Sequence, residues 1–485
     1  MQSLSTLAPQ GLWTWFNTIC SIPHPSKHEL ALRDHIQQWA DEQGLATQLD
    51  QVGNLIIRKP ATPGLEHLKG VILQAHLDMV PQKNSETEHD FVTDPIRPRI
   101  DGDWVLATGT TLGADNGIGM ASALAVLADE RIEHGPLEVL LTIDEEAGMT
   151  GAFGLEAGLL KGDILINTDS EEEGEVYMGC AGGIDVELTL PTPRSPIKAG
   201  FETFTLALTG LKGGHSGVDI HLGRGNANKL LSRFLFGHAE ALGLQLISLS
   251  GGTLRNAITR EAFATVAIDP ARRDQLAELM AHYQSLLNQE LGGVEYPIEF
   301  ALQPAEGAAD AINPEAQRQL LALIHAAPNG VIRMSDAFPG VVETSVNMGV
   351  VETVEEQVKV LCLIRSTVDS GRSMVENMLA ALAQLAGAQY QASGAYPGWN
   401  PDPSSPVMQV VRETYQGLFG KLPNIQVIHA GLECGLFKEP YPQLDMVSIG
   451  PTIQFPHSPD EKVNIPSVEK YWQLLLAVLK AVPSK

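Results

Sequence analysis

The first third of the chain alternates long apolar segments with helix-forming segments. This alternation restricts the possible folds more than any other feature of the sequence. Residues 70–80 (GVILQAHLDMV), 136–143 (PLEVLLTI) and 162–170 (GDILINTDS) are apolar enough to be central strands of a sheet. Residues 28–44 have the apolar spacing of an amphipathic helix, and residues 117–130 have the composition of a buried one. This alternation predicts an α/β layer fold around a central sheet.

The length of the chain and two changes of pattern predict two domains. A chain of 485 residues exceeds what one hydrophobic core usually supports. Glycine, proline and a new alternating strand mark a boundary near residue 183, and the stretch GAYPGWNPDPSSP at 394–406 marks a second one. The strands and helices between these boundaries have α+β character. We therefore expect a first domain of residues 1–182 and 396–485, split by an inserted domain of residues 183–395.

The net charge and the cysteines of the chain limit its binding partners and its cellular compartment. A formal net charge of −26 argues against nucleic acid or an anionic membrane as a partner, because both are polyanions. The four cysteines have no CxxC spacing, which fits neither a disulfide framework nor a cysteine zinc site. The first residues lack a basic segment followed by a long apolar core, and no apolar run has the length of a membrane span. We expect a soluble cytoplasmic protein with reduced thiols.

Two polar residues interrupt the apolar segment at 70–80. His76 and Asp78 are two positions apart, so on a strand they lie on the same side. A buried imidazole and a buried carboxylate both need partners, which each other, a metal or a substrate could supply. A histidine that is hydrogen-bonded inside a core would give the same pattern. This segment alone leaves both interpretations open.

Other acidic residues and one histidine lie at the ends of the remaining predicted elements. They are Asp115 before the buried helix, Glu145 and Glu146 after one strand, Asp169 after another, and His457 in a late loop. Each has an ordinary explanation when taken alone: a helix N-cap for the first, and solvated turns for the others. The SEEEGE run after residue 169 is expected to be surface. Sites assemble at the carboxyl ends of strands in open α/β sheets, so the whole set predicts a functional site.

The residue types in this set favour a metal centre. Two histidines and three or more carboxylates, without cysteine, are too many anions to hold together without cations. One metal takes about four ligands, so six or seven candidates with a shared carboxylate imply two metals. Zinc suits such ligands, with manganese or cobalt as substitutes. We expect one of Glu145 and Glu146 to be a ligand and the other a base, and Asp78 to orient His76.

Seven short motifs in the chain resemble one known superfamily. They are HLDMVP, GADNGIG, EEAG, NTDSEE, GGHSG, RNAI and PHSPDE, in this order and over essentially the whole chain. This series resembles the co-catalytic zinc exopeptidases related to carboxypeptidase G, aminoacylase and carnosinase. Within that superfamily the chain is most similar to the bacterial aminoacyl-histidine dipeptidases, through YMGCAGGID and HAGLECGLF as well.

The resemblance implies a role for each member of the set. One metal would be held by His76, Asp115 and Asp169, and the other by Asp115, Glu146 and His457. Glu145 would be the general base, and Asp78 would orient the ring of His76. The family also has a cis peptide bond after the shared aspartate, here between Asp115 and Asn116. The implied fold is a di-zinc exopeptidase domain with a central mixed sheet, split by an inserted lid and dimerisation domain that is ferredoxin-like and elaborated.

The resemblance also implies substrate contacts and a reaction. His215 in the inserted domain would donate to the developing oxyanion, Asn256 and Arg365 would contact the substrate carboxylate, and Glu433 would anchor the free amino group. The implied activity is metal-dependent hydrolysis of unblocked dipeptides, with a preference for Xaa-His substrates and a wider tolerance. The implied assembly is a homodimer formed through the inserted domain.

Two other functions remain possible from the sequence. A deacylase or desuccinylase of N-acyl amino acids would use the same metals but would need no anchor for a free amine. A non-catalytic binding scaffold would keep the fold and lose ligands. The presence of every expected ligand argues against the scaffold.

Overall fold

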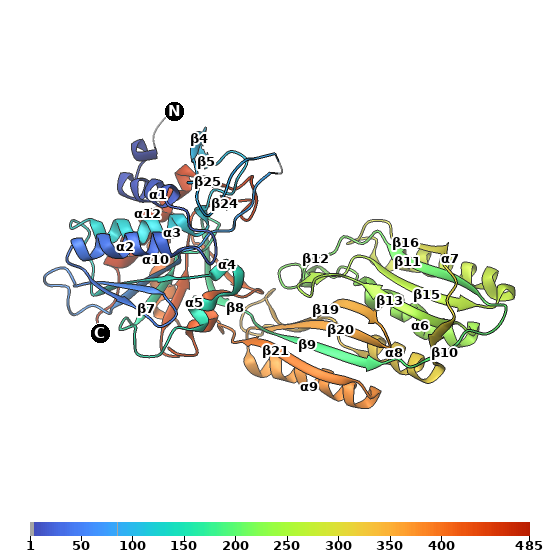
Figure 1. Cartoon of the computed structure of the whole chain (residues 1–485). Coiled ribbons are helices and arrows are strands. Elements are labelled where there is room, and N and C mark those ends of the chain that lie inside the picture. Colours follow the sequence, from blue (N-terminus) through green and yellow to red (C-terminus); the bar gives the residue numbers. More distant parts are fainter. Residues whose placement is uncertain (1–3, 85) are drawn as a thin grey trace. The chain divides into compact units, whose positions relative to one another are not determined.

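The structure is a computed structural model that describes residues 4–84 and 86–485. The chain forms two compact units: the first comprises Met1–Cys180, Trp399–Val427 and Leu432–Lys485, and the second comprises Ala181–Gly398 and Ile428–Gly431. In Figure 1 the first unit contains the blue and red ends of the colour range, and the second unit contains the green to orange part. The second unit includes the short return at 428–431, which was not part of the sequence prediction.

An eight-stranded mixed sheet forms the centre of the first unit (Figure 1). The strand order is β1-β2-β6-β3-β7-β23-β8-β22, and the four central strands β6, β3, β7 and β23 run parallel. Continuous burial of β3, β6 and β7 agrees with their apolar sequences. The strands are β1 (Ala46–Leu49), β2 (Leu55–Lys59), β3 (Val71–His76), β6 (Leu137–Thr142), β7 (Ile164–Asn167), β8 (Glu175–Cys180), β22 (Asn424–Ile428) and β23 (Asp445–Ser448).

Helices and a small sheet complete the first unit. Helix α3 is buried along its length and packs against β3 and α1, which confirms the predicted buried helix. The smaller sheet has the order β24-β25-β5-β4. The helices are η1 (Leu4–Thr6), α1 (Gln10–Ser21), α2 (Leu30–Glu42), α3 (Ala114–Ala128), α4 (Glu145–Gly148), α5 (Thr150–Phe153), α10 (Pro406–Phe419), α11 (Glu433–Phe437) and α12 (Ile465–Lys480). The small strands are β4 (Arg99–Asp101), β5 (Trp104–Leu106), β24 (Ile453–Gln454) and β25 (Lys462–Asn464).

The second unit is a large antiparallel sheet with helices. Its strand order is β16-β11-β15-β13-β19-β20-β9-β21, and β18 also pairs with β19. The sheet strands are β9 (Gly182–Pro191), β11 (Glu202–Thr209), β13 (Gln245–Gly251), β15 (Ala262–Ile268), β16 (Glu299–Pro304), β18 (Gly330–Met334), β19 (Val342–Val354), β20 (Gln357–Ser366) and β21 (Gln389–Tyr396). The helices are η2 (Ile220–Leu222), α6 (Ala227–Leu242), η3 (Pro270–Arg272), α7 (Arg273–Leu291), α8 (Pro314–Ala326) and α9 (Asp369–Ala386).

Two ferredoxin-like modules, one nested inside the other, make up this unit. The nested module follows the chain order β11-α6-β13-β15-α7-β16 and has the sheet order β16-β11-β15-β13. The outer module follows β9-α8-β19-β20-α9-β21 and has the equivalent sheet order β21-β9-β20-β19. The two modules join where β13 pairs with β19. This duplication gives the predicted elaborated lid a specific form.

A small two-stranded sheet closes the neck of the nested module. Strand β10 (Arg194–Pro196) leads into the module and strand β17 (Asp310–Ile312) leads out of it. The two strands pair antiparallel, with Arg194 opposite Ile312. The insertion therefore begins and ends at neighbouring points. A second short pair joins β12 (Gly214–His215) and β14 (Ala257–Ile258).

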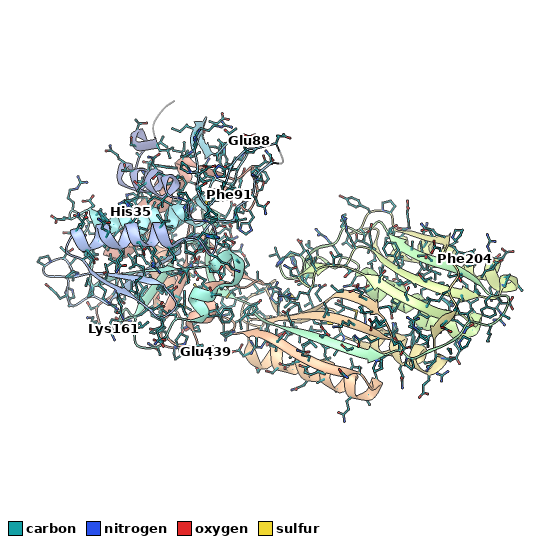
Figure 2. All side chains as sticks on the ribbon, viewed as in Figure 1. His35, Glu88, Phe91, Lys161, Phe204 and Glu439 are labelled. Atoms are coloured by element: carbon teal, nitrogen blue, oxygen red, sulfur yellow. The ribbon has the colours of Figure 1, made fainter. Side chains whose placement is uncertain are left out.

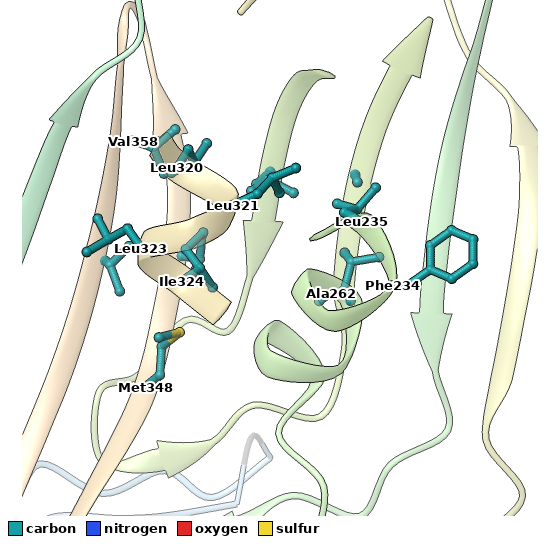
Figure 3. Close-up of a cluster of buried hydrophobic side chains, with 14 of the residues drawn as sticks. Phe234, Leu235, Ala262, Leu320, Leu321, Leu323, Ile324, Met348 and Val358 are labelled. Atoms are coloured by element: carbon teal, nitrogen blue, oxygen red, sulfur yellow. The ribbon is translucent and has the colours of Figure 1, made fainter. Parts of the chain in front are cut away.

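One continuous apolar core lies between the sheet of the second unit and its helices. It contains side chains of α6 and α8, such as Phe234, Leu235, Leu320 and Ile324, packed near strand residues that include Met348 (Figure 3). Phe204 of β11, labelled in Figure 2, belongs to the same core. The core spans both modules, so they fold as a single layer of helices on a single sheet.

Two further findings concern properties predicted from composition. All four cysteines, Cys20, Cys180, Cys362 and Cys434, are buried and free. Among the described residues, none of the helices has both the length and the apolar character needed to cross a membrane.

Candidate metal centre

The parallel strands of the first unit bring the predicted ligands to one edge of the sheet. His76 is the last residue of β3, Glu145 and Glu146 begin α4 just after β6, and Asp169 follows β7. These three strands are parallel neighbours, so the residues that follow them meet at their carboxyl ends. Asp115 lies at the start of α3, where it has non-helical backbone angles. Its peptide bond to Asn116 is cis, as the resemblance implied.

Five side chains form two groups that share Asp115. Its Oδ1 lies 3.1 Å from His76 Nε2, and its Oδ2 lies 3.2 Å from His457 Nε2. Asp169 Oδ1 completes the first group at 3.3 Å from His76 Nε2. Glu146 Oε2 completes the second group at 3.1 Å from His457 Nε2. The structure thus brings all five predicted ligands together around Asp115.

The spacing and chemistry of these atoms fit divalent metals. Zinc bonds of about 2.0–2.1 Å in a tetrahedron place neighbouring ligand atoms about 3.3 Å apart, close to the distances in both groups. Ligand atoms of His76, Asp115 and Glu146 all lie within 4.8 Å of one another. Glu146 Oε1 is buried and accepts no hydrogen bond from any residue that the structure describes. A buried carboxylate oxygen without a donor is free to bind a cation.

The electrostatics of the cluster also favour positive charge. Hydrogen bonds to Asp115 and Glu146 raise the pKa of His457 to about 11. Burial lowers the pKa of His76, but the carboxylates of Asp169 and Asp115 raise it well above its ordinary value. Burial, with the nearby Asp115 carboxylate, raises the pKa of Asp169 to about 7. The carboxylates therefore need nearby cations, which is the electrostatic requirement of a metal site.

Asp78 contacts both His76 and the backbone of Glu145 and Glu146. Its backbone carbonyl lies 3.0 Å from His76 Nδ1, and its carboxylate Oδ1 lies 3.4 Å from the same nitrogen. The same carboxylate accepts the backbone N–H groups of Glu145 (2.9 Å) and Glu146 (3.2 Å) and the hydroxyl of Ser26 (2.7 Å). Burial raises the pKa of Asp78, but His76 outweighs this effect and lowers it to about 2. Asp78 thus holds the start of α4 as well as the imidazole.

Glu145 is the acidic residue of the cluster without a partner in the ligand groups. Its carboxylate forms no hydrogen bond or ion pair with the part of the chain that the structure describes, although its backbone is held by Asp78. Burial and the charges of Asp169, Glu433 and Glu146 raise the pKa of Glu145 well above its ordinary value, against the effect of His76. A side chain held in place with an available carboxylate is suited to proton transfer.

Glu433 lies on a buried polar layer that sequence reasoning missed. It is 2% exposed, and its Oε2 accepts hydrogen bonds from Gln74 Nε2 (2.6 Å) and Thr142 Oγ1 (3.0 Å). Gln74 in turn accepts a hydrogen bond from Asn167 Nδ2 at 2.5 Å. The other oxygen, Oε1, is buried without a hydrogen bond to any described residue. A polar residue inside each of two apolar strands, Gln74 in β3 and Asn167 in β7, was the sequence signal that could have revealed this layer.

The predicted residues of the second unit meet around Ser216. Its backbone N–H donates to the carbonyl of Asn256 (2.9 Å), and its hydroxyl accepts from Arg365 Nε (3.4 Å). Arg365 is 6% exposed and donates to Tyr396 Oη at 3.1 Å. No carboxylate of the described chain lies within 4.0 Å of its guanidinium. A buried guanidinium without a carboxylate is suited to an anionic ligand.

The backbone around His215 determines which ring nitrogen carries a proton. Nδ1 accepts the N–H groups of Gly217 (3.2 Å) and Val218 (3.0 Å). Burial and the charge of Arg365 lower the pKa of His215, so the ring is neutral. A neutral ring whose Nδ1 accepts must carry its proton on Nε2. His215 therefore presents a hydrogen-bond donor at its outer nitrogen.

The expectation that the SEEEGE run is surface was wrong for Ser170, which is 6% exposed and shares a hydrogen bond with Ser448 Oγ at 2.7 Å, and for two of its glutamates. Burial and the charges of Asp115 and Asp169 raise the pKa of Glu171 to about 9, so this glutamate lies at the metal-ligand cluster. Glu173 accepts a hydrogen bond from Tyr415 Oη at 2.6 Å. Charged runs are usually solvated, and no local pattern distinguished these positions.

Comparison with known proteins identifies relatives over the full length. Residues 72–481 match the peptidase family M20/M25/M40. A cytosol non-specific dipeptidase of Escherichia coli (strain K12) is 62% identical over 485 residues, covering 100% of both chains. The crystal structure of an aminoacylhistidine dipeptidase from Vibrio alginolyticus is also 62% identical, with a TM-score of 0.95 over 100% of this chain and 99% of that one. An aminopeptidase from Bacillus cereus shares the fold, with 16% identity and a TM-score of 0.60 over 98% and 99% of the two chains.

Proposed function

The chain belongs to peptidase family M20/M25/M40, and we propose that it is a metal-dependent dipeptidase that hydrolyses unblocked dipeptides. The observation that carries this proposal is the pair of ligand groups sharing Asp115, with the unpartnered carboxylate of Glu145 beside them. The two relatives that are 62% identical are both named as dipeptidases, which supports the same activity here. One name refers to non-specific action and the other to aminoacyl-histidine, so we propose Xaa-His dipeptides as good substrates within a wider range.

We propose two divalent metal ions for each chain, zinc ions that manganese or cobalt can replace. His76, Asp115 and Asp169 would hold one, and Asp115, Glu146 and His457 would hold the other. When bound, such ions supply Lewis-acid polarisation of a carbonyl and activation of water.

Glu145 is proposed as the general base and acid of the reaction. It takes a proton from the attacking water as the new C–O bond forms, and gives it to the leaving nitrogen as the peptide C–N bond breaks. The products are a free amino acid with a new carboxylate and a free amino acid with a new amine. Asp78 fixes the backbone of Glu145 through its N–H, and the carboxylate stays free to move a proton.

The second unit is proposed to act as a lid that contributes substrate contacts. His215 presents Nε2–H, the type of donor that stabilises the oxyanion formed on the scissile carbonyl. Arg365, whose buried guanidinium has no carboxylate partner among the described residues, would bind the substrate carboxylate together with Asn256. Glu433 Oε1 would accept the free ammonium group. Contacts with both ends of the substrate would restrict it to dipeptides.

Localisation and assembly are proposed from separate observations. We propose a cytoplasmic protein, which is supported by four buried free thiols and by the name of the relative from Escherichia coli. We also propose a homodimer formed through the second unit, where Met374, Met378 and Leu385 form an exposed uncharged stripe on α9. Sedimentation of the purified chain tests the dimer, and a monomer at micromolar concentration would contradict it.

Removal of metal is expected to abolish dipeptide hydrolysis, and addition of zinc, manganese or cobalt is expected to restore it. Without cations the five ligands hold no Lewis acid to polarise the substrate carbonyl or to activate water. The measurement is release of free amino acids from an unblocked dipeptide, alongside the metal content of the same sample. A chelator already saturated with calcium is the control. Full activity in protein shown to contain no metal would overturn the proposal.

Blocking the substrate amine is expected to slow hydrolysis strongly. An N-acetylated dipeptide cannot form the charged hydrogen bond to Glu433 Oε1, and Glu433→Gln removes the same bond from the other side. Loss of such a bond costs about 2 kcal/mol, or ~30-fold in kcat/KM. The measurement is kcat/KM for free and acetylated forms with both proteins, and their ratio should shrink in the variant. Faster hydrolysis of the acetylated form would instead identify an N-acyl amino acid deacylase.

A further inference from the structure

A buried carboxylate outside the ligand set holds the backbone around Asp115. Glu461 is 2% exposed. Its Oε2 accepts the N–H groups of Leu112 (2.7 Å) and Gly113 (2.9 Å), and its Oε1 accepts the N–H of Asp115 (3.2 Å). Leu112 and Gly113 lead into α3, and Asp115 lies at its non-helical start. Two oxygens on one rigid carboxylate group therefore determine the path of the chain at this point.

Glu461 itself lies on a second ligand-bearing loop. It is four residues after His457, in the connection between β24 and β25. The N–H of Glu461 donates to the carbonyl of Ser458 at 3.0 Å, and Ser458 directly follows His457. This hydrogen bond closes a tight turn between Glu461 and the histidine. One side chain thus connects the loop of His457 to the loop of Asp115.

The shared aspartate is held from its other side as well. Asn116 Nδ2 donates to the carbonyl of Thr168 at 2.9 Å, and Thr168 directly precedes Asp169. The backbone of residues 112–116 is therefore tied to the loop of Asp169 on one side and to the loop of His457 on the other. With both ties in place, one oxygen of Asp115 faces His76 and the other faces His457.

We propose that Glu461 is a positioning residue that sets the carboxylate of Asp115 between the two imidazoles and thereby determines metal affinity. The inference rests on the proposed function only in that the cluster binds divalent metal. Groups that orient metal ligands through hydrogen bonds usually change metal affinity or activity 10- to 100-fold when they are replaced. Because Asp115 belongs to both ligand groups, displacing its carboxylate is expected to weaken the binding of both metals.

Glu461→Gln is the test, with Glu138→Gln as the matched control. Glutamine keeps the size of the side chain but turns an NH₂ group toward at least one of the three N–H donors. Glu138 is also buried, at 5% exposed, and accepts the N–H groups of Lys161 (2.7 Å) and Gly162 (2.8 Å). It lies at the start of β6, at the opposite end of that strand from the cluster. Both substitutions therefore remove a carboxylate that clamps backbone, and only one is next to a metal ligand.

The measurements are zinc affinity, by competition with a chelating indicator, and thermal unfolding of the metal-free proteins. Both variants are expected to lower the unfolding temperature, and only Glu461→Gln is expected to weaken zinc binding, by about 10- to 100-fold. Its dipeptidase activity should recover as zinc is raised, whereas that of Glu138→Gln should not depend on added zinc. Glu461→Asp, which withdraws the carboxylate by one methylene, should bind zinc as weakly as Glu461→Gln and serves if the glutamine variant does not fold.

Zinc affinity of wild-type strength in either Glu461 variant, or an equal loss in Glu138→Gln, would overturn the inference. These outcomes are separate from a failure of the proposed activity. A wild-type protein that binds zinc and hydrolyses no dipeptide would contradict the function while leaving the role of Glu461 measurable by affinity alone.

Discussion

Glu145→Ala is expected to bind metal as tightly as the wild-type protein and to lose about 10³-fold in kcat, within the range for removal of a general base. The substitution removes the carboxylate that transfers the proton, but it leaves the backbone N–H that Asp78 holds. The start of α4 should therefore stay in place. Glu146→Ala is expected to behave in the opposite way, since it removes a predicted ligand 3.1 Å from His457.

The comparison of these neighbouring variants uses two measurements. The first is the metal content at limiting zinc, which falls only when a ligand is removed. The second is turnover at saturating zinc, which stays low when the base is removed. The next residue along the chain, Ala147, is exposed, so Ala147→Ser provides a neutral substitution beside the pair. Loss of metal in Glu145→Ala with metal retained in Glu146→Ala would show that the two roles are exchanged.

His215→Ala is expected to lower kcat by about 10²- to 10³-fold with little change in KM, the effect of losing an oxyanion donor. Its Nε2–H would act on charge that develops during the reaction, so the loss should fall on turnover and not on binding. The measurement is a full kinetic analysis with an unblocked dipeptide at saturating zinc. Zinc affinity should not change, because His215 belongs to neither ligand group.

Two further variants separate this role from an effect on the loop. His215→Asn keeps an acceptor near the N–H groups of Gly217 and Val218 but lacks the outer Nε2–H, so it should remain folded and slow. His221→Ala removes an exposed histidine from the same region and should leave kcat unchanged. Turnover of His215→Ala close to that of the wild-type protein would exclude the residue from the reaction.

The ligand set could be predicted from the sequence because its members lie at the ends of strongly patterned strands. His76 ends one apolar strand and Asp169 lies two residues after another. The assignment of these strands needs no tertiary information, and parallel strands must end at a common edge. His457 lies on no such strand, and its assignment as a ligand came from the resemblance to known peptidases. Local pattern and resemblance thus supplied different parts of the same site.

The residues that support the ligands could not be predicted, because their partners are distant in the sequence. Glu461 binds the N–H of Leu112, which is 349 positions away, and Gln74 binds Glu433, which is 359 positions away. No window of sequence contains both members of either pair. Glu171 was not predicted for a different reason: it lies in a run of acidic residues, and the composition of that run is typical of a solvated turn.

The duplicated topology of the second unit also escaped prediction. Each module has ordinary strands and helices, and its identity depends on which strands pair. The join between the modules involves Ser250 opposite Glu352 and Gly251 opposite Val351, four residues without a distinctive pattern. Strand order is a tertiary property, and alternating hydrophobicity does not encode it.

The paired strands β10 and β17 at the neck of the nested module make that module removable as a block. A segment whose two ends are hydrogen-bonded neighbours can be gained or lost by a single genetic event that needs only a short connection to close the gap. Loss of the block would uncover the two positions of β19, Val351 and Glu352, that β13 now covers, while β18 would still pair with the first half of the strand. An uncovered strand edge pairs with whatever complementary edge it meets, and a second copy of the shortened chain would offer the same one.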